Sequence, residues 1–168
     1  MDIELRETIE DDLPILFEHQ LDPLATAMAA FPSRDWEAFA AHEAKIQADP
    51  SCITRTIVTD GDVVGGIGSW EADGHRLVGY WIGREFWGNG IATAALTALL
   101  DIDAERPLRA HVAKHNIGSF RVLQKCGFEI LREQHVDGVD EYVMSLPGPE
   151  PAPATTPVRG STAQRLPG

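Results

Sequence analysis

The sequence has little cysteine, no surplus of basic residues and no long apolar run. Its two cysteines, Cys52 and Cys126, have neither the number of a disulfide framework nor the spacing of a metal site. We therefore expect unpaired, partly apolar side chains, a cytoplasmic location and no metal. Residues 1–12 are acidic and contain no apolar run, which argues against a secretory signal. No segment has the length of a membrane span, so no membrane partner is expected.

The charge of the chain excludes one broad class of partner. Asp and Glu number 26 against 14 Lys and Arg, which gives a net charge of −12. Such a surface repels phosphate backbones, so no nucleic-acid partner is expected. An acidic protein attracts cationic substrates over long distances, although the same charge is also typical of proteins that need it only for solubility.

The length and composition indicate one domain followed by a tail. A chain of 168 residues with 43% hydrophobic residues can build a single core. We expect the domain to cover residues 1–146. Residues 147–168 are dominated by Pro, Ala, Gly, Thr and Ser, a composition that cannot offset the entropy of ordering. This predicts a disordered tail, with docking of a peptide-like segment as the alternative.

Helix and strand signals alternate through the predicted domain. Strands are expected over residues 3–6, 53–59, 63–70, 75–82, 108–112, 128–135 and 140–146. Helices are expected over residues 8–20, 35–48, 90–100 and 119–126. Asp-Gly turns are expected at residues 60–61, 73–74 and 137–138. The pattern predicts an α/β (α+β) fold, with a mixed, mostly antiparallel sheet of about six to seven strands and about four helices.

A glycine-rich loop between a strand and a helix, residues 79–93, is the first functional motif. Unpaired N–H groups at the helix start form an anion site, and Gly88 and Gly90 let a phosphate approach the backbone. Ala92 keeps the next position small, so the loop fits a pyrophosphate. It is not a P-loop, because no lysine follows, and it lacks the third glycine of a dinucleotide fingerprint. Alone, the motif is equally typical of a structural turn.

A second motif, residues 116–128, favours a functional interpretation of the glycine-rich loop. It places Asn116 after a strand, then a short helix, then Gly127-Phe128 before the next strand. With both motifs in this order, residues 3–146 resemble the GNAT superfamily of N-acetyltransferases. Within it, the run Trp-Gly-x-Gly-x-Ala-Thr is most similar to the RimJ/RimL branch of ribosomal-protein alanine N-acetyltransferases and their amine-acetylating relatives.

The resemblance implies acetyl-CoA as acyl donor and assigns the residues that bind it. Backbone N–H groups of the loop would bind the CoA pyrophosphate; the matching run is Trp87, Gly88, Asn89, Gly90, Ile91, Ala92 and Thr93. Trp87 departs from the Gln or Arg of the general family pattern. The backbone of Trp81 and Ile82 would pair with the pantetheine arm, and the strand beginning at Leu108 would splay away to open a slot.

The same resemblance places catalytic groups at the second motif. Asn116 would hydrogen-bond the pantetheine, and Ser119 would protonate the departing thiolate, a role that water can also fill. Ser119 is equally typical of a helix N-cap. Many GNAT enzymes use a tyrosine acid at the position that is Leu123 here. The backbone N–H near Ile82 is the candidate donor to the oxyanion.

The general base is the least determined residue, because an amine is mostly ammonium near neutral pH and must lose a proton. Glu71 is the preferred candidate, acting directly or through water; Asp73, His75 and Glu141 are alternatives. The expected reaction is direct attack of a primary amine, from a small molecule or a peptide N-terminus and of cationic character, on acetyl-CoA. The alternative is an acyl-CoA-binding sensor with little catalysis. Many relatives dimerise, so a homodimer is also an alternative.

Overall fold

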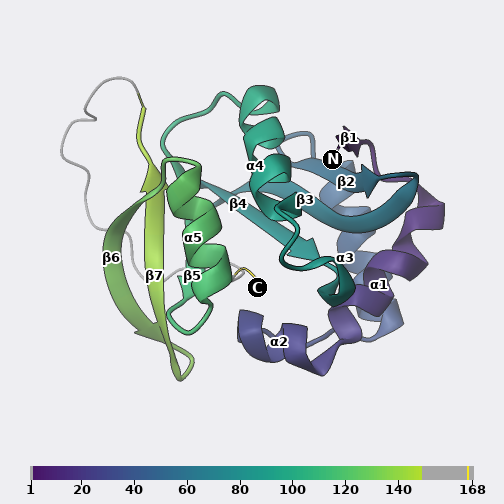
Figure 1. Ribbon diagram of the computed structural model, residues 1–168, viewed down its shortest axis with the longest axis horizontal. Coiled ribbons are helices and arrows are strands. Elements are labelled where there is room, and N and C mark those ends of the chain that lie inside the picture. Colours follow the sequence, from purple (N-terminus) through teal and green to yellow (C-terminus); the bar gives the residue numbers. More distant parts are fainter. Residues whose placement is uncertain (1, 149–165, 167–168) are drawn as a thin grey trace.

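A seven-stranded mixed sheet forms the centre of the computed structural model, which describes residues 2–148 and residue 166 (Figure 1). The strands are β1 Ile3–Arg6, β2 Ile53–Thr59, β3 Asp62–Ala72, β4 His75–Ile82, β5 Leu108–Ala113, β6 Glu129–Val136 and β7 Val139–Leu146. Their spatial order is β1-β2-β3-β4-β5-β7-β6. Among the described strands β4 and β5 form the one parallel pair, so the predicted mixed, mostly antiparallel sheet is confirmed.

Three hairpins are closed by the predicted Asp-Gly turns. Asp60 and Gly61 have φ values of 52° and 84°, and the turns at residues 73–74 and 137–138 have the same two-residue pattern of positive φ. Positive φ at both central residues defines the turn type whose twist matches a β-hairpin, and Asp-Gly is its preferred sequence. The turns therefore fix the register of β2 with β3, β3 with β4 and β6 with β7.

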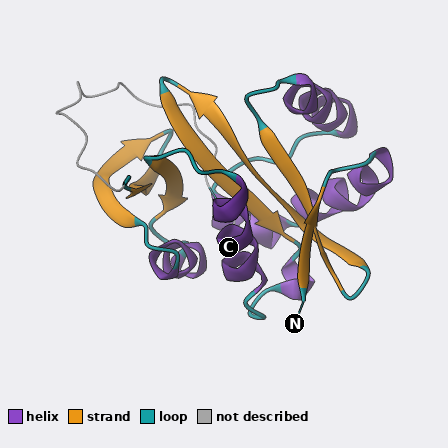
Figure 2. Cartoon of the chain, turned by 90° about the horizontal axis from the view of Figure 1, so that it is seen from above, coloured by secondary structure: helices purple, strands orange, loops and turns teal. Residues whose placement is uncertain are grey.

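Five α-helices cover the sheet, one more than expected. They are α1 Leu13–Leu21, α2 Pro23–Ala29, α3 Trp36–Ala48, α4 Ile91–Ile102 and α5 Ile117–Lys125. The core lies where α4 and α5 pack against one face of the sheet, in front of it in Figure 1. On the other side α1 contacts β3 and β4, α2 contacts β5, and α3 contacts β2. Figure 2 shows the twist of the sheet between these helices.

The N-terminal helices correct the sequence prediction. The helix expected over residues 8–20 is a short 3-10 turn, Glu10–Asp12, followed by α1, and Thr8 does not cap it, because the Thr8 hydroxyl accepts a hydrogen bond from Thr56. Helix α2 was not predicted. Its signal is present in the sequence, since Asp22 accepts hydrogen bonds from the N–H groups of Leu24 and Ala25, and Pro23 occupies the first turn.

Strands β4 and β5 separate after a short paired region. Their pairs are Arg76 with Leu108 and Leu77 with Arg109. At the paired end, the Arg76 guanidinium lies 2.9 Å from the buried carboxylate of Asp103 at the end of α4. Beyond it the strands diverge and leave a gap between them, so the predicted splay is confirmed. We refer to this opening as the β4–β5 gap.

Two further expectations concern the cysteines and the tail. Within the described residues both cysteines are free thiols, as expected. The predicted disorder of the tail falls on positions of which most, residues 149–165, 167 and 168, lie outside the described part of the chain. Leu166 is described, and it is buried in the core, which the prediction of a free tail did not include. None of the helices in the described residues is long and apolar enough to cross a bilayer.

Candidate active site

The end of β4 directs backbone polar groups toward the β4–β5 gap. The Gly83 N–H donates to the Val64 carbonyl at 2.9 Å. Because hydrogen-bonding directions alternate along an antiparallel ladder, the N–H and C=O of Ile82 are turned away from β3, toward the gap. The Ile82 carbonyl accepts a hydrogen bond from Trp87 Nε1 at 2.9 Å. The indole of Trp87 thereby ties the glycine-rich loop to the end of β4.

The loop after β4 leads into an uncapped helix. Gly88 and Gly90 have φ values of 79° and 77°, a region that L side chains rarely adopt, which explains both glycines. Asn89 holds the turn from its side chain, since its Nδ2 donates to the Phe86 carbonyl at 3.1 Å. No side chain of the described residues caps α4 at Gly90. The N–H groups of Ile91, Ala92 and Thr93 are therefore available to an anion, aided by the helix dipole.

The start of α5 supplies a buried amide and a buried hydroxyl. Asn116, rather than Ser119, is the N-cap: its Oδ1 accepts a hydrogen bond from the Ser119 N–H at 3.2 Å. The Asn116 Nδ2 donates to the Leu166 carbonyl at 2.7 Å. Both Asn116 and Ser119 are almost completely buried. The N-cap interpretation of Ser119 was therefore wrong, and its hydroxyl is not needed to start the helix.

Tyr80 is a candidate that the sequence interpretation missed. It lies on β4, it is 4% exposed, and its buried hydroxyl forms no hydrogen bond of good geometry within the described residues. Burial raises the pKa of Tyr80, an effect that the nearby Ser119 hydroxyl partly offsets. The phenol therefore stays protonated and is available as a hydrogen-bond donor. Two hydroxyls, one from β4 and one from α5, thus lie close together near the gap.

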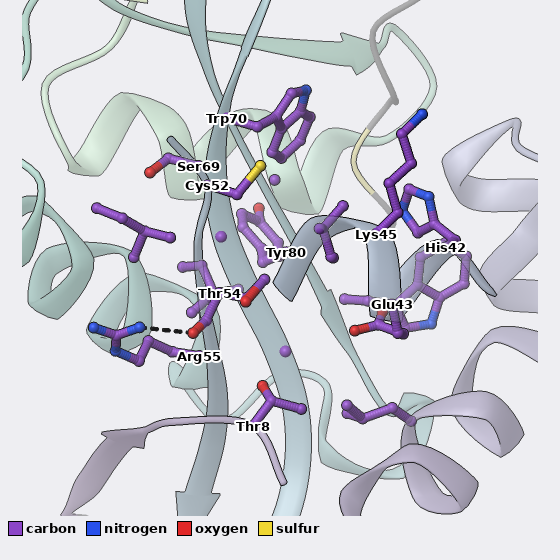
Figure 3. A pocket seen from close by; sticks show the side chains of 18 of the residues that line it. Thr8, His42, Glu43, Lys45, Cys52, Thr54, Arg55, Ser69, Trp70 and Tyr80 are labelled. Carbon is purple, nitrogen blue, oxygen red and sulfur yellow. Dashed lines mark hydrogen bonds between the residues drawn. The ribbon is translucent and has the colours of Figure 1, made fainter. Parts of the chain in front are cut away.

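A cavity of about 510 Å³ opens on the side of the sheet covered by α1 and α3 (Figure 3). Its volume is typical of small-molecule sites. In Figure 3, His42 and Glu43 on α3 lie across the cavity from Thr54 and Trp70 on the sheet. The remaining lining includes Phe31, Arg34, Phe39, Trp81, Gly79, Tyr80 and Leu166. Because the last three residues belong to the gap or border it, the cavity reaches the β4–β5 gap.

Burial shifts the pKa of two neighbouring side chains of α3 that line the cavity. Burial raises the pKa of Glu43, and a hydrogen bond with Gln47 and the charge of Arg34 only partly offset it. Burial also lowers the pKa of His42, which Arg34 and Lys45 lower further. Perturbed ionisable groups inside a cavity are typical of functional sites. Glu43, on α3, was not predicted because its chain position gives no sign that it faces β3 and β4.

The structure pairs the carboxylate of Glu71 with an arginine. The Glu71 carboxylate lies 3.6 Å from the Arg76 guanidinium, at the end of β4 that is still paired with β5. Side chains alternate along a strand, so Glu71 shares a face with Ser69, and Trp70 faces the cavity. Glu71 is among the residues that line the cavity, but its carboxylate is 44% exposed and lies beside the Arg76 guanidinium.

The other three candidate bases, unlike Glu71, are not among the residues that line the cavity. Asp73 is part of an exposed turn, and His75 follows it at the start of β4. Glu141 is buried on β7, where its Oε1 accepts a hydrogen bond from Gln134 and lies 3.3 Å from His111 Nδ1. Within the described residues no group of three His, Cys, Asp or Glu side chains could hold a metal ion.

Comparison with known families identifies the family of the chain. Residues 2–129 match the sequence model of the family described as acetyltransferase (GNAT) domain. The chain belongs to the GNAT acetyltransferase family. Membership confirms the expectation of an acetyl-CoA-dependent acyltransferase with the GNAT fold. No curated protein sequence is similar enough to count as a relative.

Solved GNAT structures share the fold at low sequence identity. The aminoglycoside acetyltransferase AAC(6')-Ib in complex with coenzyme A is 18% identical, with a TM-score of 0.73 over 87% of this chain and 95% of that one. A chimera of the spermidine N-acetyltransferase SpeG from Vibrio cholerae and hSSAT is 17% identical, with a TM-score of 0.72 over 86% of this chain and 95% of the chimera. A GNAT acetyltransferase from Streptococcus pneumoniae is 20% identical, with a TM-score of 0.69, and 86% and 98% are covered.

Proposed function

We propose that this GNAT acetyltransferase transfers the acetyl group of acetyl-CoA to a primary amine, of a small molecule or a peptide N-terminus, by direct attack. One observation carries the proposal: the β4–β5 gap connects two different binding regions. The uncapped start of α4 lies beside the end of β4, and the 510 Å³ cavity reaches the gap from the side of α1 and α3. The donor and the acceptor can therefore meet in the gap from opposite sides of the sheet.

The residues present fit acetyl-CoA, which supplies the activated acetyl thioester. The uncapped first turn of α4 and the orphaned hydroxyl of Tyr80 are unmet polar groups of the kind that a ligand satisfies. Backbone N–H groups of residues 88–93 would bind the pyrophosphate, while Trp87 and Asn89 hold the loop in shape. Along the gap, Ile82 would pair with the amide-rich pantetheine, and Asn116 would donate to it. Trp81, the preceding residue of β4, would contribute to the same pairing through its backbone.

We propose three hydrogen-bond donors for the reaction, from β4 and α5. The Ile82 N–H, directed into the gap, would donate to the thioester oxygen as that oxygen gains negative charge. Ser119 would give its proton to the sulfur as the carbon–sulfur bond breaks, and would recover one from solvent. Tyr80, whose raised pKa keeps it protonated, would donate a hydrogen bond in the same region.

Removal of the Ser119 hydroxyl separates its chemical role from its structural one. We expect Ser119→Ala to lower kcat about tenfold to a hundredfold, toward the low end of acid catalysis, because a thiolate is a good leaving group. The KM for acetyl-CoA should change little, since the N–H of residue 119 still bonds to Asn116. Tyr80→Phe is the companion variant, also lacking one buried hydroxyl. Unchanged kcat in Ser119→Ala would leave water as the acid.

The general base is proposed to be Glu43, in place of Glu71. Glu43 lines the cavity from α3 and its pKa is raised by burial, which brings a carboxylate closer to the pH at which an amine must be deprotonated. Glu71, preferred from the sequence, is 44% exposed and paired with Arg76. Glu43 would accept the amine proton directly or through a water molecule.

The acceptor is proposed to be cationic. The net charge of −12 attracts cations, and Glu43 provides a carboxylate among the aromatic walls of the cavity. Two structural neighbours are, by name, an aminoglycoside and a spermidine N-acetyltransferase, which supports polyamines and amino sugars as candidates. The loop sequence Trp-Gly-x-Gly-x-Ala-Thr supports the RimJ/RimL branch, and with it a peptide N-terminus. We propose a cytoplasmic location on the basis of the free thiols.

Salt dependence tests the charge of the acceptor. The KM should be measured for spermidine, kanamycin and a monoamine of similar size, at low and at physiological ionic strength. For a cationic acceptor we expect KM to rise with salt, because salt screens attraction to the acidic surface. The rise should grow with the charge of the amine. A KM that is independent of salt for all three amines would contradict the proposal.

A second candidate function is favoured by one observation. Leu123 occupies the position at which many GNAT enzymes carry their tyrosine acid, and it is completely buried in the core. An acyl-CoA-binding sensor with little catalysis would also retain the gap and the loop. Turnover of any amine separates this candidate from the enzyme.

A further inference from the structure

Leu166 occupies the β4–β5 gap although it lies far beyond the last strand in sequence. Its side chain is 1% exposed and belongs to the hydrophobic core. The side chain lies against Gly79 of β4, where a Cβ would be 3.4 Å from Leu166 Cδ2, an ordinary van der Waals contact. Leu166 also lines the cavity that reaches the gap. A single leucine thus sits where the two strands separate.

Both backbone polar groups of Leu166 are hydrogen-bonded inside the gap. Its N–H donates to the His111 carbonyl at 3.0 Å, on the part of β5 that no longer pairs with β4. Its carbonyl accepts from Asn116 Nδ2 at 2.7 Å. The residue therefore behaves as a short piece of strand added to the open edge of β5, anchored by an apolar side chain.

These contacts coincide with those proposed for the donor. A pantetheine arm carries amides, which offer one N–H and one C=O each, and Leu166 presents the same two groups. Asn116 is the residue proposed to donate to pantetheine, and here the Leu166 carbonyl takes that bond. Leu166 also fills the space beside β5 that the pantetheine arm would need, with its side chain buried and its N–H bonded to His111. The two occupants therefore exclude each other.

We infer that Leu166 is an intramolecular competitor of acetyl-CoA, which the donor must displace from the β4–β5 gap before it binds. This inference rests on the proposed function, because it takes the gap to be the donor site. The apparent dissociation constant is then the intrinsic one divided by the fraction of molecules in which the gap is open. Any change that favours release of Leu166 should tighten donor binding, with no new contact to the donor.

Leu166→Glu tests the competition, with Leu131→Glu as the matched control. The glutamate would place an unpaired carboxylate in the core, so residue 166 should leave the gap. We expect the Kd for acetyl-CoA, measured by calorimetry, to fall at least about tenfold. Leu131 lies on β6 and is 47% exposed, so the same substitution there should leave the Kd unchanged. An equal Kd in all three proteins would overturn the inference.

A second measurement covers the case in which Leu166→Glu does not fold. Leu166→Ala retains both backbone hydrogen bonds and removes only part of the apolar anchor, so it should tighten binding by a smaller factor. In the unmodified protein, hydrogen exchange of the Leu166 amide should become faster when acetyl-CoA is added, because donor binding breaks its bond to His111. Slower or unchanged exchange with bound donor would contradict competition.

The outcomes separate this inference from the proposed function. Tight binding by the unmodified protein, with no gain in either Leu166 variant, removes the competitor and leaves the donor site intact. Tighter binding of acetyl-CoA by Leu166→Glu supports both the competition by Leu166 and the donor site in the gap. If neither the unmodified protein nor any variant bound acetyl-CoA, the proposed donor site would be wrong, and so would the inference that Leu166 competes for it.

Discussion

Replacement of Glu43 by glutamine is expected to lower kcat by about 10²- to 10⁴-fold, the range for loss of a positioned base. Glutamine keeps the size and polarity of the side chain but cannot accept the proton of an attacking ammonium. Because burial raises the pKa of Glu43, activity of the unmodified enzyme should fall as the pH drops through that raised value. In Glu43→Gln this acidic limb of the pH–rate profile should disappear. Steady-state kinetics with saturating acetyl-CoA measures both effects.

Glu71→Gln provides the matched control, because it makes the same chemical change in an exposed carboxylate at the rim of the same cavity, where Glu71 is paired with Arg76. We expect kcat to stay within about twofold and the pH–rate profile to keep its shape. The reverse result, with loss of activity in Glu71→Gln and none in Glu43→Gln, would restore the base preferred from the sequence. It would also require Glu71 to reach the gap from its pairing with Arg76.

Replacement of Gly90 by glutamate is expected to weaken acetyl-CoA binding by at least about a hundredfold. Gly90 is the N-cap of α4, and the N–H groups that follow it are the proposed pyrophosphate site. A carboxylate at this position would occupy the same anion site and repel the phosphates. Part of the effect comes from backbone strain, since φ is 77° at this position. Calorimetric titration with acetyl-CoA gives the loss directly.

Gly61→Glu separates the two contributions. Gly61 has a φ of 84° in the turn between β2 and β3, and at both glycines a Cβ would meet no described atom within 4 Å. The two variants should therefore lose similar thermal stability. Gly61→Glu should bind acetyl-CoA as the unmodified protein does. If both variants bound acetyl-CoA normally, the loop would be a structural turn and the pyrophosphate site would lie elsewhere.

Local sequence signals predicted most of the sheet and the donor loop. The Asp-Gly turns need no information beyond two residues, because positive φ at both positions selects this sequence. The loop from Trp87 to Thr93 is equally local, since glycines and an uncapped helix start define an anion site in any fold. The splay of β4 from β5 was inferred only from the family resemblance. The splay depends on how the two strands pack against other parts of the chain, which local sequence does not show.

The groups that the sequence interpretation missed are defined by contacts over long sequence distances. Glu43 becomes a buried carboxylate only because α3 packs beside β2 and α1, and Tyr80 becomes a buried donor only because the core closes around it. Leu166 lies in a segment whose composition predicts disorder, yet its N–H donates a hydrogen bond to His111 at the open edge of β5. Helix α2 is different, because Asp22-Pro23 is a recognisable local start that was overlooked.

Acetyl transfer to an amine is the measurement that tests the central claim most directly. The unmodified protein and Leu166→Glu should each be incubated with acetyl-CoA and a panel of polyamines, amino sugars and peptides with a free N-terminus. Free thiol and acetylated product are then quantified together by mass spectrometry. We predict equal amounts of thiol and acetylated amine for at least one acceptor, with faster turnover at low donor concentration in Leu166→Glu. If both proteins bound acetyl-CoA but transferred acetyl to none of the amines, the result would contradict the proposed acetyltransferase activity and favour an acyl-CoA-binding sensor.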